Sequence, residues 1–600
     1  MTSKQNSPAE TPPLDAAAMA QLYADIAGKS SELLTQYMAR GAKGMPAFTD
    51  ELGIAKAFCE AWQHMLADPM RIAGMQMKLW QDYSTLWQQS MLKMFGQDAA
   101  PVAEPDKTDR RFRGEGWESN FVFDYIKQSY LIAARHLQHS LGDVAGLDDK
   151  TAKKVDFYTR QYIDALAPSN FLMTNPEALR ETVNSGGQNL VKGLHNLLED
   201  LSQSDGSQLR VRMTDTGAFR LGENIAASKG KVVFQNDIMQ LIQYAPLTAK
   251  VHATPLLIIP PWINKYYILD LRENNSFVRW AVEQGHTVFV VSWVNPDGQL
   301  AHKRFDDYLT EGLLAALDVI AEITGEKQAN VIGYCLGGTL LAATLAWLAA
   351  KKQPRIRSAT FFVSMIDFER PGELEVFIDE QQVTALEKKM EQRGYLEGSE
   401  MATTFNMLRA NDLIWSFVVS NYLMGKDPFP FDLLYWNGDS TRMPAAMHSF
   451  YLRNLYLKNL LCQPGGVTLA GVPIDVTGIK TPAYFISTAE DHIAPWQSTY
   501  AGAQLLKGPV RFVLGGSGHI AGIINPPAAN KYGYWTNDKL PAQSADWLAG
   551  AKQQPGSWWT DWAQWAAGHA GDPVAARKPG SKRYPALEDA PGSYVRQRIA

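Results

Sequence analysis

The chain has 600 residues, of which 46% are hydrophobic and 20% are charged, and its formal net charge is −5. This length exceeds what one compact core needs, so we expect two domains, one of them large. The composition is that of a globular protein, and the charge gives no general attraction to nucleic acid, so we predict no nucleic-acid partner.

The number of cysteines and the lengths of the apolar runs indicate the cellular compartment of the protein. The three cysteines, Cys59, Cys335 and Cys462, are too few and too scattered for a disulfide framework or a zinc site, and an odd number favours a reducing compartment. The first fifteen or so residues lack the apolar stretch of a signal peptide, and no uninterrupted apolar run reaches the roughly 18 residues of a membrane span. We expect a cytoplasmic protein without a metal centre or a transmembrane segment, although adsorption to a surface stays open.

The N-terminal third has a helical pattern. Residues 1–18 are polar and contain proline, which predicts disorder. A helical N-terminal domain is predicted over residues 19–205, in which Asp68 and Pro69 form an N-cap and first-turn pair. Apolar residues follow at helical spacing: Ile72, Met75, Leu79, Tyr83 and Leu86. We expect this face to pack against a core or a partner rather than to form a ligand site.

From residue 206 onwards, apolar strands alternate with helices. The predicted hairpin is 231–246, and the predicted buried strands are 254–262, 285–293, 329–335, 356–368, 481–493 and 508–519. Helical stretches such as 308–325 and 339–352 lie between several of them. This alternation predicts an α/β domain over 206–600, with a mostly parallel sheet and helices on both faces. The stretch 369–473 interrupts the alternation and is predicted to be an inserted cap at the carboxyl edge of the strands.

One turn between a predicted strand and helix has the form of a nucleophile elbow. Its residues are Gly333-Tyr334-Cys335-Leu336-Gly337-Gly338, with cysteine in the nucleophile's place. Glycines suit such a tight turn because a Cβ atom would strike a neighbouring strand or helix. The helix that starts at Leu336 points its positive end at the sulfur and favours the thiolate. We therefore predict that Cys335 is a catalytic nucleophile rather than a buried structural cysteine.

An acid and a base are predicted at later strand ends. In this kind of fold they follow the nucleophile in the order acid, then histidine. Asp491 comes just after one predicted strand, and His519 lies in a glycine-rich loop after the next. Glu490 is the rival for the acid role. His492 is predicted either to contact substrate or to orient its loop.

An oxyanion hole is predicted next to the nucleophile. It combines the backbone amide after the nucleophile, here Leu336, with an amide from the loop after the first parallel strand. The second donor is predicted to be Ile263, with Trp262 as the alternative. Asn264 and Lys265 follow on the same loop and either position substrate or face solvent.

Sulfur in place of oxygen favours acyl transfer over hydrolysis. A thiolate attacks a thioester by an almost isoenergetic exchange, and the acyl group then stays activated on the enzyme as a thioester. A serine would leave a more stable ester. The predicted reaction is therefore transfer from a thioester donor to a hydroxyl group.

Nearly the whole chain, except its extreme N-terminus, resembles the class I polyhydroxyalkanoate synthases of proteobacteria. The segments that carry the resemblance are "DRRF", "PPWINKYYILDL", "GHTVFVVSW", "GYCLGG", "LRANDLIW", "NYLMGKDPFPFDLLYWNGDSTRMP", "EDHI", "GGSGHIAGIINPP" and "APGSYV". The resemblance implies an α/β-hydrolase fold and the polymerisation of (R)-3-hydroxyacyl coenzyme A, above all 3-hydroxybutyryl coenzyme A, into a storage polyester. Coenzyme A is released, and no cofactor is implied.

The resemblance also implies roles for single residues. His519 would deprotonate Cys335, and Asp491 would help to activate the 3-hydroxyl that attacks the next acyl group. Arg409 matches an arginine near the family's active site, and Trp436 matches a tryptophan of the cap. Both could equally be structural.

The implied partners are the growing polyester chain, a second copy in a homodimer, the storage granule and granule-associated proteins. Two aromatic stretches, 72–94 and 556–569, would suit contact with a granule. Ordinary packing is nevertheless the favoured interpretation of both. A thioesterase or lipase-like hydrolase on the same fold and a granule scaffold without turnover are the alternative functions.

Overall fold

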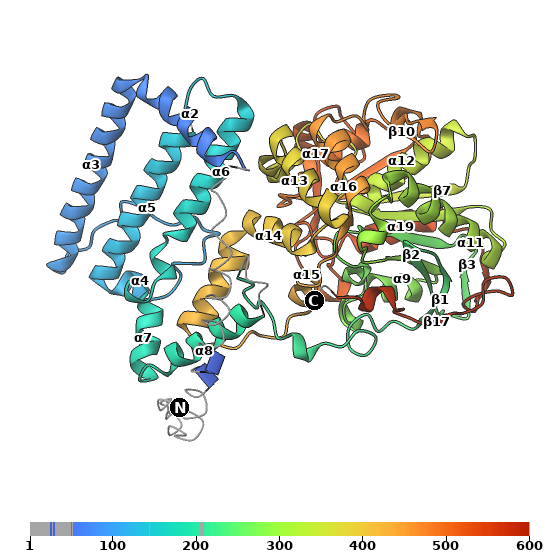
Figure 1. Ribbon diagram of the computed structural model, residues 1–600, viewed down its shortest axis with the longest axis horizontal. Helices are drawn as coiled ribbons and strands as arrows, with labels where there is room; N and C mark the ends of the chain where they lie inside the picture. The colour runs from blue at the N-terminus through green and yellow to red at the C-terminus, as the bar shows by residue number, and fades with distance from the viewer. Residues whose placement is uncertain are drawn as a thin grey trace. The chain divides into compact units, whose positions relative to one another are not determined.

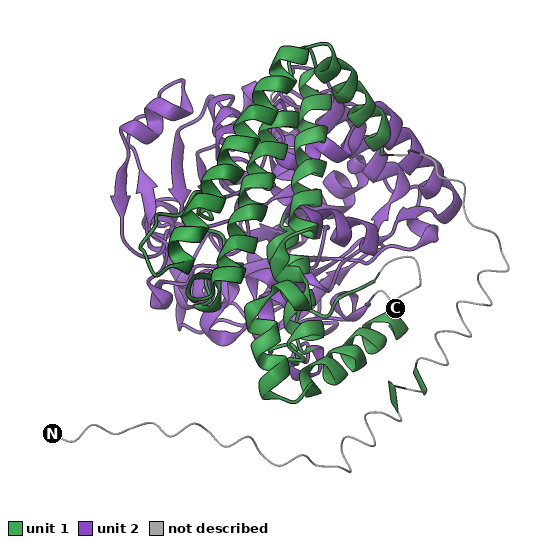
Figure 2. Ribbon diagram, turned by 90° about the vertical axis from the view of Figure 1, so that its left-hand side faces the viewer, with its two compact units in different colours: residues 1–215, 409–429 green, residues 216–408, 430–600 purple. Residues whose placement is uncertain are grey.

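The computed structural model describes residues 25–26, 28–29, 50, 52–142, 144–203 and 209–598. The chain divides into two compact units (Figure 2): unit 1 contains residues 1–215 and 409–429, and unit 2 contains residues 216–408 and 430–600. The segment predicted to be disordered, 1–18, lies outside the described residues.

This division differs from the predicted domains in two places. Unit 1 extends to residue 215, and it also takes in 409–429, which the prediction assigned to the cap 369–473. Side chains of the N-terminal helices hold this segment, because Asn189 Nδ2 donates to Leu423 O at 2.7 Å and Asn196 Nδ2 donates to Asn421 O at 3.1 Å.

Unit 1 is built from helices, and the long helices α3, α5 and α6 lie side by side in it (Figures 1 and 2). Its helices are α2 (Ile54–Leu66), α3 (Pro69–Met94), α4 (Gly116–Ser119), α5 (Phe121–Gly142), α6 (Asp149–Ala165), α7 (Pro176–Asn184) and α8 (Gln188–Ser202), with the π-helical turns η9 (Asn411–Trp415) and η10 (Val418–Leu423). The predicted cap of α3 is confirmed, since Asp68 Oδ1 accepts from the Arg71 amide at 3.0 Å.

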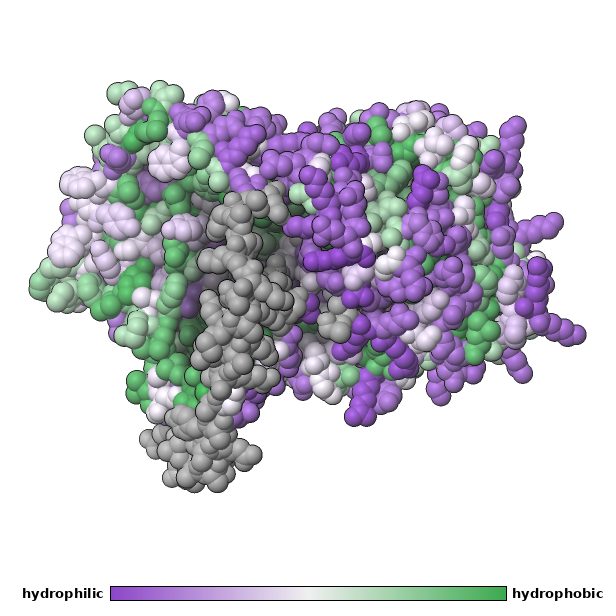
Figure 3. All heavy atoms as spheres, viewed as in Figure 1, coloured by the Kyte–Doolittle hydropathy of each residue, from purple (hydrophilic) through white to green (hydrophobic). Residues whose placement is uncertain are grey.

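The apolar face of α3 is divided between core and surface. Leu86 is fully buried, but Trp80 is 71% exposed and Trp87 is 60% exposed. Met77 and Met94 are exposed as well, and Figure 3 shows hydrophobic residues at the surface over this helix. Ordinary packing is confirmed for the predicted face at Leu79, Tyr83 and Leu86, which packs within unit 1, whereas the side chains of Trp80 and Trp87 beside it are mostly exposed.

The second aromatic stretch is part of the core. In and beside α19 (Trp559–Ala567), the side chains of Trp558, Trp559 and Trp562 are each 1% exposed. They pack against one face of the sheet of unit 2. Ordinary packing is confirmed for this stretch.

Unit 2 contains one large sheet with the strand order β15-β14-β13-β12-β7-β6-β4-β5-β2-β1-β17 (Figure 1). Its parallel strands are β4 (Leu256–Ile259), β5 (Val288–Trp293), β6 (Ala329–Tyr334), β7 (Ile356–Phe362), β12 (Ala483–Thr488) and β13 (Val510–Gly515). Its antiparallel strands are β1 (Gly230–Gln235), β2 (Met239–Tyr244), β14 (Tyr534–Thr536), β15 (Lys552–Gln554) and β17 (Glu588–Asp589). The predicted hairpin and the six predicted buried strands are confirmed.

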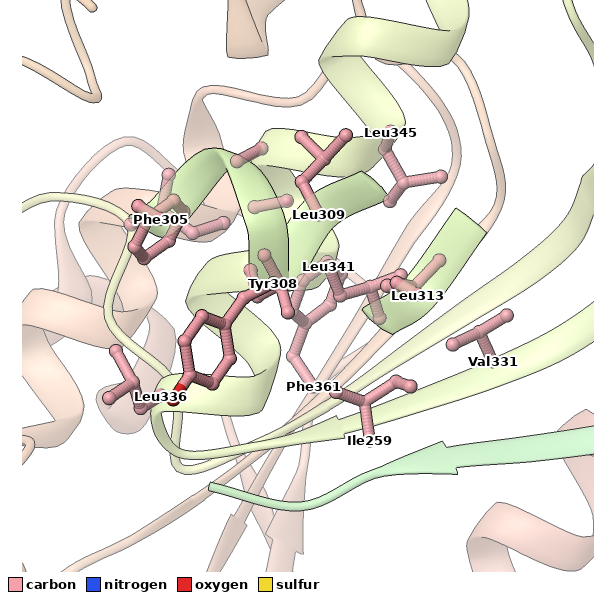
Figure 4. Close-up of a cluster of buried hydrophobic side chains, with 14 of the residues drawn as sticks. Ile259, Phe305, Tyr308, Leu309, Leu313, Val331, Leu336, Leu341, Leu345 and Phe361 are labelled. Carbon is pink, nitrogen blue, oxygen red and sulfur yellow. The ribbon is translucent and has the colours of Figure 1, made fainter. Parts of the chain in front are cut away.

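Helices cover both faces of this sheet, as predicted. In β4, Leu257 and Ile259 belong to the core on one face, and Leu256 and Ile258 belong to the core on the other. The first face packs against α11 (Ala315–Thr324) and α12 (Leu336–Ala350), and Figure 4 shows Leu341 and Leu345 of α12 in the same buried cluster as Ile259 and Val331 of the sheet. The second packs against α9 (Phe277–Glu283) and α19. The chain therefore has the predicted α/β-hydrolase architecture.

Further elements of unit 2 complete the region between β7 and β12 and the edges of the sheet. They are β3 (Lys250–His252), α10 (Phe305–Asp307), the π-helical η7 (Tyr308–Leu314), α13 (Glu380–Arg393), β8 (Tyr395–Leu396), α14 (Gly398–Leu408), α15 (Asp432–Asn437), β9 (Met443–Pro444), α16 (Ala445–Phe450), the π-helical η11 (Tyr451–Leu457), β10 (Thr468–Leu469), β11 (Val472–Pro473), α17 (Trp496–Gln504), α18 (Ser544–Ala549) and β16 (Pro573–Ala575). Among the described residues, no helix is both long and apolar enough to span a bilayer.

Candidate active site

Cys335 stands at a sharp turn between a strand and a helix. β6 ends at Tyr334 and α12 begins at Leu336. The backbone of Cys335 has φ 51° and ψ −118°, which is a strained conformation for a residue with a side chain. Its amide donates to Phe362 O of the neighbouring strand at 2.8 Å. The half-buried sulfur therefore occupies a fixed place at the carboxyl end of the parallel strands.

Three glycines allow this turn to pack so closely. A Cβ atom on Gly337 would lie 2.1 Å from Ile259 O, and one on Gly338 would lie 2.0 Å from Ser364 Oγ. A Cβ atom on Gly333 would lie 2.4 Å from the Cα atom of Gly338. Real Cβ atoms do not approach other atoms so closely, so the predicted reason for these glycines is confirmed.

The loops after β12 and β13 bring an acid to a histidine. His519 Nδ1 lies 2.7 Å from Asp491 Oδ2, and both residues are buried. Cys335 lies close enough to His519 for its charge to raise the pKa of the imidazole. Glu490, the rival acid, is exposed. The structure thus brings together Cys335, His519 and Asp491 in the order predicted for a catalytic triad.

Asp491 is engaged on both carboxylate oxygens. The amides of Ile493 and Ala494 each donate to Oδ1 at 2.9 Å, while Oδ2 faces His519. The side chain of Asp491 has no exposed area. This geometry lets the carboxylate act through His519, and a part of Asp491 in activating a substrate hydroxyl stays a prediction.

The surroundings of His519 favour its protonated form. Burial lowers the pKa of His519, but the negative charges of Asp491 and Cys335 outweigh burial and raise this pKa from 6.5 to about 10. The ring of Tyr334 stacks on the imidazole with 5.9 Å between centroids. The site therefore holds the imidazole of His519 in a setting that favours a positive charge beside the Cys335 sulfur.

The backbone amides predicted for the oxyanion hole can be checked for hydrogen-bond partners. The Gly338 and Thr339 amides donate to Cys335 O, so the Leu336 amide precedes the first hydrogen-bonded turn of α12. Within the described residues, no hydrogen bond uses the Ile263 amide, whereas the next amide, that of Asn264, donates to Thr441 Oγ1 at 2.9 Å. The Trp262 amide likewise makes no hydrogen bond there, so Leu336 with Ile263, or with Trp262 as the alternative, stays the predicted pair of donors.

Comparisons with known proteins identify the family of this site. The family model described as Poly-beta-hydroxybutyrate polymerase (PhaC) N-terminus matches residues 108–281, and the model described as alpha/beta hydrolase fold matches residues 257–526. A poly(3-hydroxyalkanoate) polymerase from Methylorubrum extorquens is 50% identical to this chain, covering 90% of it and 88% of its own length. The chain belongs to the poly(3-hydroxyalkanoate) polymerases.

Two further members of the family support this placement. The poly(3-hydroxyalkanoate) polymerase subunit from Rhizobium meliloti is 49% identical, covering 91% of this chain and 89% of its own length. The corresponding subunit from Cupriavidus necator is 46% identical, covering 88% and 89%. The predicted resemblance is confirmed, and the chain is an acyltransferase of this family.

The remaining candidate residues of the polymerase loop are engaged by its own structure. Asn264 has φ +63°, and its side-chain Nδ2 donates to Asn437 O at 3.4 Å. Trp436 is buried, and its Nε1 donates to Lys265 O at 2.6 Å. Trp262 is buried, and its ring lies 4.3 Å from that of Tyr308. These contacts shape the loop, and a substrate contact of Asn264 or Trp436 stays a prediction.

Two other predicted residues lie apart from these contacts. Arg409 is exposed, belongs to unit 1 and pairs with Asp412 at 2.7 Å. His492 is half-buried directly after Asp491, and its carbonyl lies against Gly372. A substrate role of either residue stays a prediction.

A pair of packed tyrosines at the polymerase site, Tyr451 buried and Tyr456 half-buried, was missed from sequence. Tyr451 and Tyr456 lie on η11, with their rings 5.3 Å apart and perpendicular. Burial raises the pKa of both hydroxyls, and the nearby charge of Cys335 raises them further. The five-residue spacing fits a turn of π-helix, but nothing in the sequence around it distinguishes such a turn from an α-helix.

Proposed function

We propose that this chain polymerises (R)-3-hydroxyacyl coenzyme A, with 3-hydroxybutyryl coenzyme A as the first substrate to test, and releases coenzyme A. The observation that carries the proposal is the buried, hydrogen-bonded His519–Asp491 pair beside a cysteine at a nucleophile elbow. Membership of the polymerase family supports the substrate class. The reaction as proposed needs no metal or organic cofactor.

The first step is acylation of the cysteine. The Cys335 thiolate attacks the thioester carbonyl, and a bond forms between Sγ and the acyl carbon. The bond from that carbon to the coenzyme A sulfur breaks, and His519 gives its proton to the departing thiolate. The amides of Leu336 and Ile263 stabilise the oxyanion that forms on the carbonyl oxygen.

The second step transfers the acyl group to a hydroxyl. His519, now neutral and held by Asp491, accepts the proton of a 3-hydroxyl group as its oxygen attacks the enzyme-bound thioester. An ester bond forms, and Cys335 Sγ leaves as the thiolate that the imidazolium balances. Sulfur suits this cycle because the thioester keeps the acyl group activated between the two steps.

A single assay separates this function from a hydrolase and from a scaffold. Purified protein is given 3-hydroxybutyryl coenzyme A, and free thiol and turbidity are followed together. Thiol with insoluble polyester supports the polymerase, thiol alone means a thioesterase or lipase-like hydrolase, and neither signal means a scaffold. Cys335→Ala should abolish both signals, and Cys335→Ser should be far weaker than the native protein.

We propose further that the protein acts in the cytoplasm as a homodimer at the granule surface, where granule-associated proteins can also contact it. The exposed Trp80 and Trp87 on α3 offer an apolar surface for such contacts. Sedimentation analysis with and without polyester granules tests both statements. A monomer that stays in the supernatant would contradict them.

A further inference from the structure

A buried ion pair lies beside the loop that carries the Ile263 amide. Lys265 Nζ is 2.7 Å from Asp439 Oδ1, and the two side chains are only 3% and 2% exposed. The other carboxylate oxygen of Asp439 accepts from the Tyr267 hydroxyl at 2.8 Å. The pair therefore ties residues on both sides of Tyr266 to the segment that follows α15.

The C-terminal segment completes the environment of this lysine. Lys265 Nζ donates to Val595 O at 2.8 Å and to Gln597 O at 2.9 Å, in addition to Asp439. An ammonium group has three N–H donors, so each donor has one acceptor here. The acceptors come from parts of the chain 174 and more than 300 residues away, which this one side chain brings together.

The other end of Lys265 is held too. Its carbonyl accepts from Trp436 Nε1 at 2.6 Å, and the preceding amide, that of Asn264, donates to Thr441 Oγ1. Ile263 stands only two residues before Lys265, and no hydrogen bond within the described part of the chain uses its amide. The direction of that amide therefore depends on contacts immediately next to it.

The Lys265–Asp439 pair is better suited to fixing the position of the backbone than to stabilising the fold. Burial lowers the pKa of Lys265, and the Asp439 carboxylate opposes that shift. A buried ion pair gains little over an apolar pair of similar shape, because desolvation offsets its attraction. Its directional hydrogen bonds, however, fix a backbone more narrowly than apolar contacts do.

We propose that Lys265 is a positioning residue for acyl transfer: its bonds to Asp439, Val595 and Gln597 hold the Ile263 amide where the oxyanion forms. This inference rests on the proposed function, since it concerns the acylation of Cys335. On this proposal, the C-terminal segment affects catalysis through Lys265 and does not itself contact the substrate. A displacement of about 1 Å at an oxyanion donor is enough to slow catalysis about a hundredfold.

The test compares two substitutions with a matched control. Lys265→Met removes the ammonium and keeps the length of the side chain, and Asp439→Asn removes the charge and keeps the shape. Lys231→Met is the control, because Lys231 pairs with Asp589 of the same C-terminal segment at the exposed sheet edge. For both test variants we expect kcat for coenzyme A release to fall about a hundredfold with KM nearly unchanged. The control should keep the native kcat.

A second readout separates positioning from general damage to the site. Alkylation of Cys335 by iodoacetamide, followed by peptide mass spectrometry, needs the thiolate and His519 but forms no oxyanion. We expect its rate in Lys265→Met and Asp439→Asn to stay within about twofold of native, because neither variant removes a transition-state stabiliser of that reaction.

Truncation tests the C-terminal acceptors independently of substitutions in the loop. A chain that ends at Arg598 keeps both carbonyls and should behave as native, whereas a chain that ends at Tyr594 lacks both and should lose kcat as Lys265→Met does. If Lys265→Met does not fold, Asp439→Asn and the Tyr594 truncation decide the matter.

Two results would overturn the proposal. One is a kcat within threefold of native in both substitutions, and the other is a loss of alkylation rate as large as the loss of kcat. Failure of the proposed function looks different, because the native protein itself would then release no coenzyme A or form no polyester.

Discussion

The pKa of His519 is shifted by burial and by the charges of Asp491 and Cys335. Burial lowers its pKa, but Asp491 and Cys335 together raise the pKa to about 10, whereas the histidine of an unfolded chain titrates near 6.5. The folded protein therefore binds this proton more tightly, and the resulting stabilisation is complete below about pH 6.5 and is lost as the pH rises to about 10. In calorimetry, we expect the melting temperature of the native protein to fall between pH 7 and pH 10 by more than that of His519→Gln. Equal falls would show that His519 is not the titrating group.

Asp491 and its neighbour Glu490 form a natural pair for comparison. Asp491→Asn removes the charge that holds the imidazolium, so we expect kcat for coenzyme A release to drop by about 10² to 10⁴. Glu490→Gln alters an exposed side chain one residue away and should leave kcat within about twofold. Initial rates of thiol release give both values. A larger loss in Glu490→Gln than in Asp491→Asn would reverse the assignment of the acid.

The triad could be predicted from sequence because each member follows a recognisable apolar strand, and strand ends of a parallel sheet meet at one edge. The environment of each member could not be predicted. Tyr451 and Tyr456 come from a helical insertion whose path depends on packing. The sequence left two possibilities for Lys265, positioning of substrate or exposure to solvent. Only the fold shows that its hydrogen-bond acceptors lie on Asp439 and on the C-terminal segment.

The elbow between β6 and α12 depends on close contact between the helix and β4. A Cβ atom on Gly337 would meet Ile259 O at 2.1 Å, so Gly337→Ala must push α12 away from the sheet. We expect a loss of stability of about 1–3 kcal/mol or more and a nearly complete loss of coenzyme A release. Gly478→Ala is the control, because a Cβ atom there meets no heavy atom within 4 Å. Melting temperature and activity are measured for both variants, and a Gly337→Ala protein as stable and active as the control would contradict the packing argument.

A strand or helix could be predicted from sequence where its hydrophobic pattern extends over enough residues to be recognised. Parallel strands such as β5 and β12 are buried along their whole length and read as continuous apolar runs. The short strands β14, β15 and β17, near the two ends of the sheet, have two or three residues each and carry no such pattern. These short strands form because neighbouring strands offer hydrogen-bond partners. The sequence does not show which strands those neighbours are.

Each of the two units is formed by two separate segments of the chain. The chain leaves unit 2 after Leu408, passes through unit 1 as 409–429 and returns at Pro430. Helical hydrophobic periodicity shows that 411–423 packs against something, but it does not say which core receives it, and this is why the sequence placed the whole insertion in one domain. The polar contacts that decide the matter join residues hundreds of positions apart.

Arg111, in the "DRRF" segment, is the charged residue that fixes this crossing segment within unit 1. Its Nη1 donates to Asp164 Oδ1 at 3.0 Å, to the Tyr130 hydroxyl at 3.1 Å and to Asn411 Oδ1 at 3.3 Å. The guanidinium is largely buried, so Arg111→Ala leaves these acceptors without their donor, at a cost of about 1.5–3 kcal/mol. We expect amide hydrogen exchange over 411–423 to quicken about tenfold to a hundredfold, since local opening follows that free energy. Arg110→Ala changes an exposed neighbour in the same segment and should leave the exchange unchanged, so equal protection in the two variants would mean that apolar packing alone holds 409–429 in unit 1.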